Sequence, residues 1–422
     1  MSDSSIRRAV LANGVRLVTE EMPHVRSVAI GVWLMRGSRH EPPAHAGIAH
    51  FVEHMLFKGT PTRSAEAIAQ QVDSIGGQID AFTSKEYAGY YVKVLDEHLP
   101  IAIEILADLV ANPLLAETDI EREKKVILEE IKMVEDTPDD LVHEIFSESF
   151  WAGHALGRPI LGTPASVAEL DRPTLARYFG QTYVASNFVV VASGHLEHDR
   201  VRELLDTALS TIPKQGPSAA LVAPVTAATV QIRHKDLEQS HVCFGTAALP
   251  QHHPDRHAAY VLNTTLGGSM SSRLFQNVRE KRGLAYAVFS GLSAYQDAGA
   301  LSIYAGCANE AVAELIDVVV AEIRQMKAEG LNQAELRRAK DHLKGSLMLS
   351  LESTSSRMSH LARQEMYGDE TDTLDEMLAA IERVTEPDVE RLANRFFSDN
   401  ALAVTVLGNV DGLQVRREQL RL

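Results

Sequence analysis

The sequence is poor in cysteine and has no long apolar run. Only two cysteines, Cys243 and Cys307, occur in 422 residues, and both lie in apolar, strand-like surroundings. A scaffold held together by disulfides is therefore excluded, and two reduced, buried thiols are expected. No apolar stretch is long enough to span a membrane, and Met1–Asn13 lacks the hydrophobic segment that a signal peptide needs. These absences predict a cytoplasmic protein that does not bind membranes.

Positive charge is also scarce. The chain has 41 lysines and arginines against 57 aspartates and glutamates, a formal net charge of −16. Without a basic surface to meet phosphates, nucleic-acid binding is excluded. No G-x-S-x-G sequence is present, so a serine hydrolase with that nucleophile elbow is not expected. The hydrophobic fraction of 45% and the charged fraction of 23% are ordinary for a globular protein, and the length predicts at least two domains.

The most informative motif that is present is His50-Phe51-Val52-Glu53-His54. On a helix, residues four apart lie one above the other, so His50 and His54 can offer two imidazoles to one metal ion. Glu53 lies on nearly the same face, where its carboxylate can reach a water on that metal. Two neutral imidazoles suit zinc, and a carboxylate that is not a ligand is what activation of water requires. Two surface histidines on an amphipathic helix are the simpler alternative, but the surrounding residues are strongly apolar.

A catalytic zinc ion usually has three protein ligands and an open position for water, so a third ligand must come from another element. Thr118–Met133 has an apolar stripe of helical period and many glutamates. Glu123 and Glu130 lie two turns apart on one face of this helix, and either can point at the metal. Spacing alone neither chooses between them nor excludes Glu129, because a glutamate-rich helix often carries only a solvated acidic face.

The two halves of the chain repeat one order of elements. Each half starts with β-rich strands, continues with a helix, a strand pair and long helices, and closes on a strand before a glycine. The segment 212–229 is rich in Pro, Ala and Ser and is interpreted as a linker. We therefore predict an α+β fold in which two homologous α/β sandwich domains, each a sheet flanked by helices, occupy 1–211 and 230–422. The second half lacks H-x-x-E-H where its counterpart helix is expected, at about 271–280.

These motifs resemble the pitrilysin family of zinc peptidases, which includes insulin-degrading enzyme and the mitochondrial processing peptidase. The resemblance is carried by His50-x-x-Glu53-His54 together with the glutamate-rich run Glu123–Glu130, and it covers nearly the whole chain. Further similar segments are 76–84, 154–162, 267–275 and 279–286. The chain resembles the short, two-domain type of this family, similar to the beta subunit of the processing peptidase.

The resemblance implies a complete ligand set. The family's third ligand lies about 76 residues beyond the second histidine, which in this chain is Glu130. Glu123 is then expected to orient one of the ligands by a hydrogen bond without contacting the metal itself. One zinc ion per chain is therefore expected, held by His50, His54 and Glu130.

The resemblance also implies a place for the substrate. Residues 76–84 are similar to the family's active-site edge strand. Ala81, Phe82 and Thr83 are therefore expected to bind an extended peptide by backbone hydrogen bonds. Asp80 stands where the family usually has Asn, which leaves the contribution of this position open.

In the second half, the resemblance assigns a paired arginine and tyrosine, Arg279 and Tyr286. A guanidinium and a phenol are suitable donors to the negative charge that develops on a peptide carbonyl oxygen during hydrolysis. A surface arginine and a core tyrosine are the simpler interpretation of the sequence alone. In long family members, the domain with this pair faces the zinc domain across a closed chamber. A two-domain chain then implies a homodimer, or a heterodimer with a related subunit, and the pair acts within its own chain or across the interface.

The sequence thus predicts a zinc metalloendopeptidase that hydrolyses peptides or unfolded, presequence-like segments inside a dimeric chamber. Zinc-activated water is the nucleophile and Glu53 is the general base. The alternative is a non-catalytic structural subunit of the same fold, like the core proteins of respiratory complexes. Such relatives tend to lose H-x-x-E-H or the distal glutamate, and both are present here.

Overall fold

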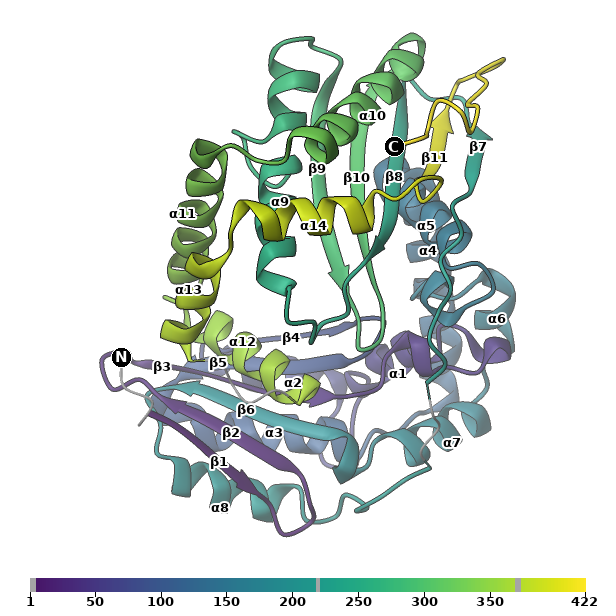
Figure 1. Ribbon diagram of the computed structural model, residues 1–422. Coiled ribbons are helices and arrows are strands. Elements are labelled where there is room, and N and C mark those ends of the chain that lie inside the picture. Colours follow the sequence, from purple (N-terminus) through teal and green to yellow (C-terminus); the bar gives the residue numbers. More distant parts are fainter. Residues whose placement is uncertain (1–4, 218–220, 369–372) are drawn as a thin grey trace. The chain divides into compact units, whose positions relative to one another are not determined.

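The computed structural model describes residues 5–217, 221–368 and 373–422, and the chain divides into two compact units (Figure 1). The first unit contains Met1–Lys132, Arg158–Leu221 and Leu349–Thr371, and the second contains Met133–Gly157, Val222–Met348 and Asp372–Leu422. Each unit is a mixed β-sheet with helices on its faces. This confirms the predicted α+β fold with two similar α/β domains.

The first unit is built on a six-stranded sheet in the order β1-β2-β6-β3-β5-β4. Its strands are β1 (Ile6–Val10), β2 (Arg16–Glu21), β3 (Ser27–Leu34), β4 (Gln78–Thr83), β5 (Ala88–Leu95) and β6 (Phe188–Gly194). β2 and β6 run parallel, and the other neighbouring pairs are antiparallel. The central strands β3 and β6 are almost entirely buried because helices cover both faces, and their sequences are accordingly apolar. β4 is an edge strand, with β5 as its neighbour.

One face of this sheet holds the main core of the first unit. The helices on this side are α1 (Ile48–Leu56), α2 (Ala65–Ser74), α3 (Leu99–Ala111), α4 (Glu117–Asp136), α6 (Pro164–Glu169), α7 (Arg172–Thr182) and α8 (His198–Ala208). α3 supplies much of the core, since eight of its 13 residues are buried. α1 packs beside it through Phe51 and Met55, which are fully buried.

The other face of the same sheet is covered by a helix from far along the chain, α12 (Thr354–Tyr367). Met358 and Leu361 of α12 pack with Trp33 of β3 and Val191 of β6. In exchange, α5 (Pro138–Phe150) of the N-terminal half lies in the second unit. Each half of the chain thus lends one helix to the other unit. The domain boundaries given above, 1–211 and 230–422, stay a prediction.

The second unit has a five-stranded sheet in the order β7-β11-β8-β10-β9. Its strands are β7 (Val230–His234), β8 (Gln239–Ala248), β9 (Ala285–Ala294), β10 (Gly299–Ala308) and β11 (Ala403–Gly408). One face packs against α9 (Arg256–Leu266), α10 (Val312–Glu329) and α14 (Glu386–Phe396), and α5 packs on the other. α11 (Gln333–Ser350) and α13 (Leu374–Arg383) flank this core. Cys243 and Cys307 are buried and free, as expected.

The two sheets share one topology. β7, β11, β8, β10 and β9 repeat the order and the directions of β2, β6, β3, β5 and β4, including the single parallel pair. The internal repeat is therefore real, but its alignment needs a correction. The first helix after β8 is α9, so α9, and not the segment at 271–280, is the counterpart of α1. The structure at that segment is a turn followed by a short π-helix, η7 (Phe275–Glu280).

The connection between the halves has no regular structure where it is described. Residues 212–217 and 221–229 form no helix or strand, and 218–220 of the predicted linker lie outside the described residues.

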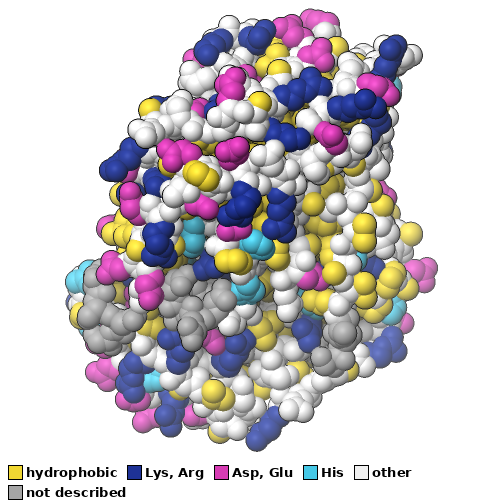
Figure 2. Space-filling view, in the orientation of Figure 1, with side chains coloured by type: hydrophobic (Ala, Val, Ile, Leu, Met, Phe, Trp, Pro, Cys, Tyr) yellow, Lys and Arg dark blue, Asp and Glu magenta, His cyan; other side chains and the backbone are white. Residues whose placement is uncertain are grey.

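On the face drawn in Figure 2, basic and acidic side chains are interspersed. None of the described helices combines the length and the apolar character that crossing a lipid bilayer requires.

Candidate metal centre

Helix α1 presents two different sides. Phe51 and Met55 on its apolar side are fully buried in the core. His50, Glu53 and His54 lie on the remaining side and are half-buried. The ring centroids of His50 and His54 are 4.6 Å apart, so the four-residue spacing brings the two imidazoles together.

Helix α4 brings a carboxylate to the two histidines. Its buried isoleucines, which anchor it to the core, are Ile120, Ile127 and Ile131. Oε2 of Glu130 lies 3.7 Å from Nε2 of His50 and 3.6 Å from Nε2 of His54. Among the described residues, these three form the one group of His, Cys, Asp or Glu side chains whose ligand atoms, all within 4.8 Å of one another, could hold a metal ion.

This donor set fits a zinc ion. Oε2 of Glu130 is buried and has no hydrogen-bond partner in the part of the chain that the structure describes, which is costly for a carboxylate oxygen. Its distances to the two imidazole nitrogens are too long for hydrogen bonds. Ligand atoms bound to tetrahedral zinc at about 2.0–2.1 Å lie about 3.4 Å from one another, close to the observed spacing. Burial, with a smaller contribution from His54, lowers the pKa of His50 to about 4, which keeps its ring neutral.

The second nitrogen of His54 contacts a different glutamate. Nδ1 of His54 lies 3.0 Å from Oε2 of Glu123, a buried side chain whose Oε1 accepts from Nζ of Lys58 at 2.8 Å. An imidazole that donates from Nδ1 presents an unprotonated Nε2 to a metal. Glu129 is exposed and pairs with Lys132 at 2.7 Å. The three glutamates that spacing alone could not distinguish therefore have different surroundings: Glu130 faces both histidines, Glu123 contacts only one of them, and Glu129 is exposed.

Glu53 faces the edge strand of the sheet. The hydroxyl of Thr83 on β4 donates a hydrogen bond to Oε2 of Glu53. Burial raises the pKa of Glu53, and the hydrogen bond from Thr83 opposes part of that rise. A carboxylate whose pKa is shifted toward neutrality is well suited to accept a proton and to return it.

The residues predicted to bind substrate lie along the free edge of β4. Ala81 and Thr83 turn toward α1 and the core, whereas Asp80 and Phe82 turn to the opposite face of the sheet. Phe82 is 36% exposed, and its ring centroid lies 6.4 Å from that of Tyr91 on β5. No other described strand pairs with β4 beyond β5, so the outward N–H and C=O groups of β4 can pair with an added strand.

Asp80 is held at both of its oxygens. The hydroxyl of Tyr91 donates to Oδ2 at 2.9 Å, and the backbone N–H of Ala81 donates to Oδ1 at 2.8 Å. These two donors accommodate the negative charge that stands in place of the usual asparagine.

In the second unit, Arg279 and Tyr286 lie together. The guanidinium carbon of Arg279, on η7, is 4.7 Å from the ring centroid of Tyr286. Tyr286 lies at a β-bulge, where the register between β9 and β10 shifts between Gly306 and Cys307, and it is 81% exposed. Bulges and π-helical turns re-aim side chains and are frequent at functional sites. The simpler interpretation of Tyr286 as a core residue is therefore wrong, while the role of the pair at a zinc ion stays a prediction.

Sequence reasoning missed Glu41, which organises the start of α1. Its oxygens accept hydrogen bonds from the backbone N–H groups of Gly47 at 2.9 Å and Ala49 at 2.8 Å, two donors of the helix N-terminus. Burial raises the pKa of Glu41 to about 7, although these two N–H groups act in the opposite direction. Arg158 donates to the backbone carbonyl of Glu41 at 2.9 Å, which gives part of the segment 154–162 a structural role. No spacing rule links a carboxylate in a preceding loop to a helix several residues later.

Known families and proteins are similar to this chain over most of its length. Residues 16–164 match the family described as insulinase (peptidase family M16), and residues 169–343 match the one described as peptidase M16 inactive domain. The uncharacterized zinc protease YmxG of Bacillus subtilis is 43% identical over 400 residues, which cover 94% of this chain and 98% of that protein. An uncharacterized zinc protease of Streptomyces coelicolor is 39% identical, covering 98% of this chain and 92% of that one.

Two solved structures share the fold. The first is described as a peptidase M16 inactive domain from Pseudomonas fluorescens and has a TM-score of 0.91 at 21% identity, covering 97% of this chain and 99% of that chain. The second is a protease from Helicobacter pylori, with a TM-score of 0.88 at 24% identity, covering 95% and 99%. At these identities the likeness concerns the fold.

Proposed function

The chain belongs to the M16 (insulinase) family of zinc proteases, and from this membership we propose that it is an endopeptidase that cleaves extended peptides beside β4. The observation that carries the proposal is the position of Glu130 Oε2. This oxygen is buried, has no hydrogen-bond partner among the described residues, and lies 3.7 Å and 3.6 Å from Nε2 of His50 and His54. His50, His54 and Glu130 would hold one zinc ion per chain.

The side chains around this centre support peptide hydrolysis. Zinc bound there would lower the pKa of a water toward neutrality and polarise the scissile carbonyl. Glu53 accepts the proton of the attacking water and passes it to the leaving amine. Thr83 orients the carboxylate of Glu53, and burial raises the pKa of that carboxylate, which makes it a stronger base toward the attacking water. Glu123 fixes the ring of His54 and is itself held by Lys58.

The substrate class follows from the edge strand. A peptide that adds to β4 forms backbone hydrogen bonds, which tolerate many different side chains. Such pairing requires an extended segment, and a folded domain does not supply one at its surface without opening. We therefore expect peptides and unfolded, presequence-like segments as substrates, with Ala81, Phe82 and Thr83 along the binding edge.

Arg279 and Tyr286 would donate to the developing oxyanion or to the adjacent peptide group. The exposure of Tyr286 and the π-helical position of Arg279 support a role at a surface where another group can approach. A homodimer whose second units complete each other's sites is our preferred arrangement, with a heterodimer as the alternative. The proposed location is the cytoplasm.

A non-catalytic structural subunit is disfavoured by two observations. The donor set is intact, with Glu130 facing both histidines and Glu53 beside them. Similar proteins from Bacillus subtilis and Streptomyces coelicolor are named zinc proteases.

The test of the proposed function combines metal analysis with turnover. Purified protein should contain about one zinc per chain and should cleave quenched fluorogenic peptides. A chelator should abolish the cleavage, and added zinc should restore it. Protein that is free of metal, cannot be reconstituted and leaves all peptides intact would overturn the proposal.

A further inference from the structure

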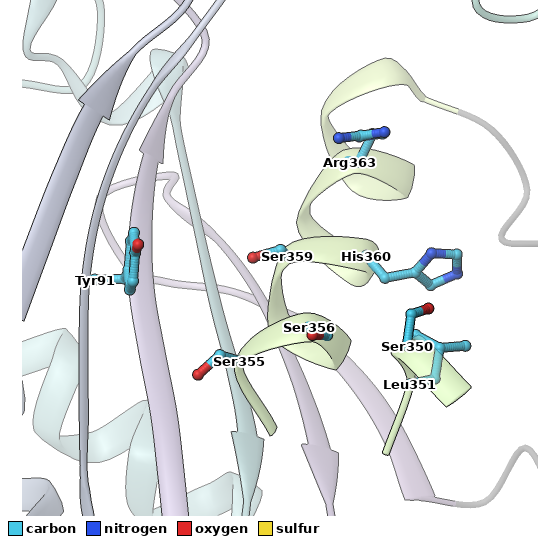
Figure 3. Close-up of a pocket in the computed structure, with 8 residues that line it drawn as sticks. All are labelled: Tyr91, Ser350, Leu351, Ser355, Ser356, Ser359, His360 and Arg363. Atoms are coloured by element: carbon cyan, nitrogen blue, oxygen red, sulfur yellow. The ribbon is translucent and has the colours of Figure 1, made fainter. Parts of the chain in front are cut away.

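A groove lies beside α12 in the first unit, on the face of the sheet that is turned away from α1 (Figure 3). Its volume is about 360 Å³. All of its lining residues except Leu351 carry a polar group, and those that matter here are Tyr91, Ser355, Ser356, Ser359, His360 and Arg363. Figure 3 shows Ser355 and Ser359 extending from α12 toward Tyr91 on β5, with His360 on an adjoining side of the helix.

The groove is formed because α12 covers only part of the sheet. Its apolar side chains, among them Met358 and Leu361, pack against β2, β3 and β6. Ser355, Ser359 and Arg363 recur every four residues and therefore form a stripe along one flank of the helix. This flank faces β5, where Tyr91 forms the opposite wall.

The lining offers hydrogen-bond donors that the protein itself does not use. Within the described residues, the hydroxyls of Ser355, Ser356 and Ser359 make no hydrogen bond to the protein, and the guanidinium of Arg363 makes no ion pair. None of the residues that line the groove is an Asp or a Glu, although the chain has 57 of them and a net charge of −16. An unpaired guanidinium among hydroxyl donors favours an anionic group and discriminates against a cation.

This groove adjoins the edge strand on which the peptide is proposed to lie. Tyr91 is the register partner of Asp80 on β4, and its ring lies 6.4 Å from that of Phe82. Along an added strand, side chains alternate between the two faces of the sheet. Every second peptide side chain would therefore point toward the zinc ligands, and the others would pass over Phe82 and Tyr91 toward α12.

We propose that the groove between α12 and β5 binds a carboxylate of the peptide, from an acidic side chain on the face turned away from the zinc ligands or from the peptide's C-terminus. The proposal rests on the proposed function, because it requires a peptide on β4. Arg363 supplies the charge and the serine hydroxyls supply additional donors. An added strand lies about 5 Å from β4 and about 10 Å from β5. A glutamate therefore reaches the groove better than an aspartate.

The test measures binding, so that it does not depend on turnover. The probe is a fluorescein-labelled peptide of alanine and glutamine in which a single glutamate is moved along the sequence, and anisotropy reports its binding to zinc-loaded Glu53→Gln protein. Each peptide is made with a free and with an amidated C-terminus. The same peptides are measured with Arg363→Gln, with Arg363→Lys and with Arg200→Gln, an exposed arginine of α8 in the same unit, each in the Glu53→Gln background.

We expect glutamate at alternate positions, or the free C-terminus, to bind about 3- to 10-fold more tightly than its neutral counterpart. Arg363→Gln should abolish that preference, Arg363→Lys should retain part of it, and Arg200→Gln should leave it unchanged. The two peptide series identify which carboxylate is bound. Equal binding of charged and neutral peptides, or a preference that survives Arg363→Gln, overturns this inference alone. If no peptide binds at all, the inference falls together with the proposed function.

Discussion

The two units repeat one sheet topology but carry different side chains at corresponding places. In the first unit, the helix that follows the central strand β3 carries His50 and His54 one turn apart, and Glu53 contacts the edge strand β4. In the second unit, the corresponding helix α9 has no such motif. The edge strand β9 instead carries Tyr286 at a bulge, beside Arg279 on a π-helix. Chemistry is therefore set by the local backbone of each unit and not by the shared fold.

This difference has a physical basis. The regular four-residue repeat of helix α1 places both imidazoles on one side, where they can serve as two ligands to one ion. Donors to a developing charge need to be aimed at one point, and an irregular backbone aims side chains that regular elements would turn elsewhere. The same strand order thus carries a regular helix with two imidazoles in the first unit, and a bulge beside a π-helix in the second.

Replacement of Glu53, the proposed general base in the first unit, should have the largest effect on turnover. Glu53→Gln is expected to lower kcat by about 10²- to 10⁴-fold, because Gln cannot accept the proton. The zinc content should be unchanged, since Glu53 is not in the ligand set. Glu129→Gln, an exposed position on α4, is the matched control and should retain activity. Undiminished turnover of Glu53→Gln would break the assignment of catalysis to this side chain.

Loss of the arginine in the second unit should be the next largest effect. Arg279→Ala is expected to lower kcat/KM by about 10²- to 10³-fold if it donates to the oxyanion, with zinc binding intact. Arg282→Ala is the control, because Arg282 is an exposed arginine close by in the sequence. Full activity of Arg279→Ala would contradict a catalytic role for Arg279.

Mixing two impaired variants would show whether Arg279 and Tyr286 act within their own chain or across a dimer. Glu53→Gln chains and Arg279→Ala chains, each of low activity alone, should regain activity when combined if the pair acts across a dimer. Activity that stays low in the mixture, under conditions where the chains exchange, would place the pair within its own chain.

A smaller effect, on zinc affinity, is expected from replacing Glu123, which contacts Nδ1 of His54. Glu123→Gln should weaken zinc binding by about 10- to 100-fold, because the carboxylate no longer fixes the ring and its tautomer. Competition with a chromogenic chelator measures this change. Glu121→Gln, exposed on the same helix, should bind zinc like the unchanged protein. Equal affinities for the two variants would mean that Glu123 serves only its ion pair with Lys58.

The smallest effect concerns the start of α1. Glu41 has its pKa raised from 4.5 to about 7 by burial, so folding favours its protonated form. Its contribution to the free energy of unfolding is therefore fully present below pH 4.5 and is lost as the pH rises through about 7. Glu41→Gln should remove this dependence and cost about 1–3 kcal/mol, because one backbone N–H loses its acceptor.

Unfolding of zinc-free protein at pH 5 and pH 8 checks this prediction. Asp255→Asn, at the start of the counterpart helix α9, is the control because Asp255 makes no capping hydrogen bond to that helix. A pH dependence that is identical in Glu41→Gln and the unchanged protein would contradict the role of Glu41.

Local patterns were sufficient for much of the fold and for the geometry around α1. Strand and helix periodicity predicted both halves of the repeat. The four-residue spacing predicted that His50 and His54 would meet, as they do. Glu130 could be chosen over Glu129 only by resemblance, because both lie on the same helix and their burial depends on tertiary packing.

Other features depend on contacts between residues distant in the sequence. The exchange of α5 and α12 between the units could not be predicted, because each helix looks like any amphipathic helix of its own half. The capping of α1 by Glu41 depends on a loop that folds back on the helix. The bulge at Tyr286 depends on pairing with β10, and the groove depends on how far α12 extends over the sheet.

The central claim is that His50, His54 and Glu130 hold one zinc ion, and the most direct test compares zinc binding by Glu130→Gln and Glu129→Gln. The two glutamates are neighbours on α4, but Glu130 faces the histidines and Glu129 faces solvent. We predict that Glu129→Gln binds one zinc per chain and that Glu130→Gln binds zinc at least about 100-fold more weakly, as expected for loss of a direct ligand. Equal and tight zinc binding by both variants would contradict the account.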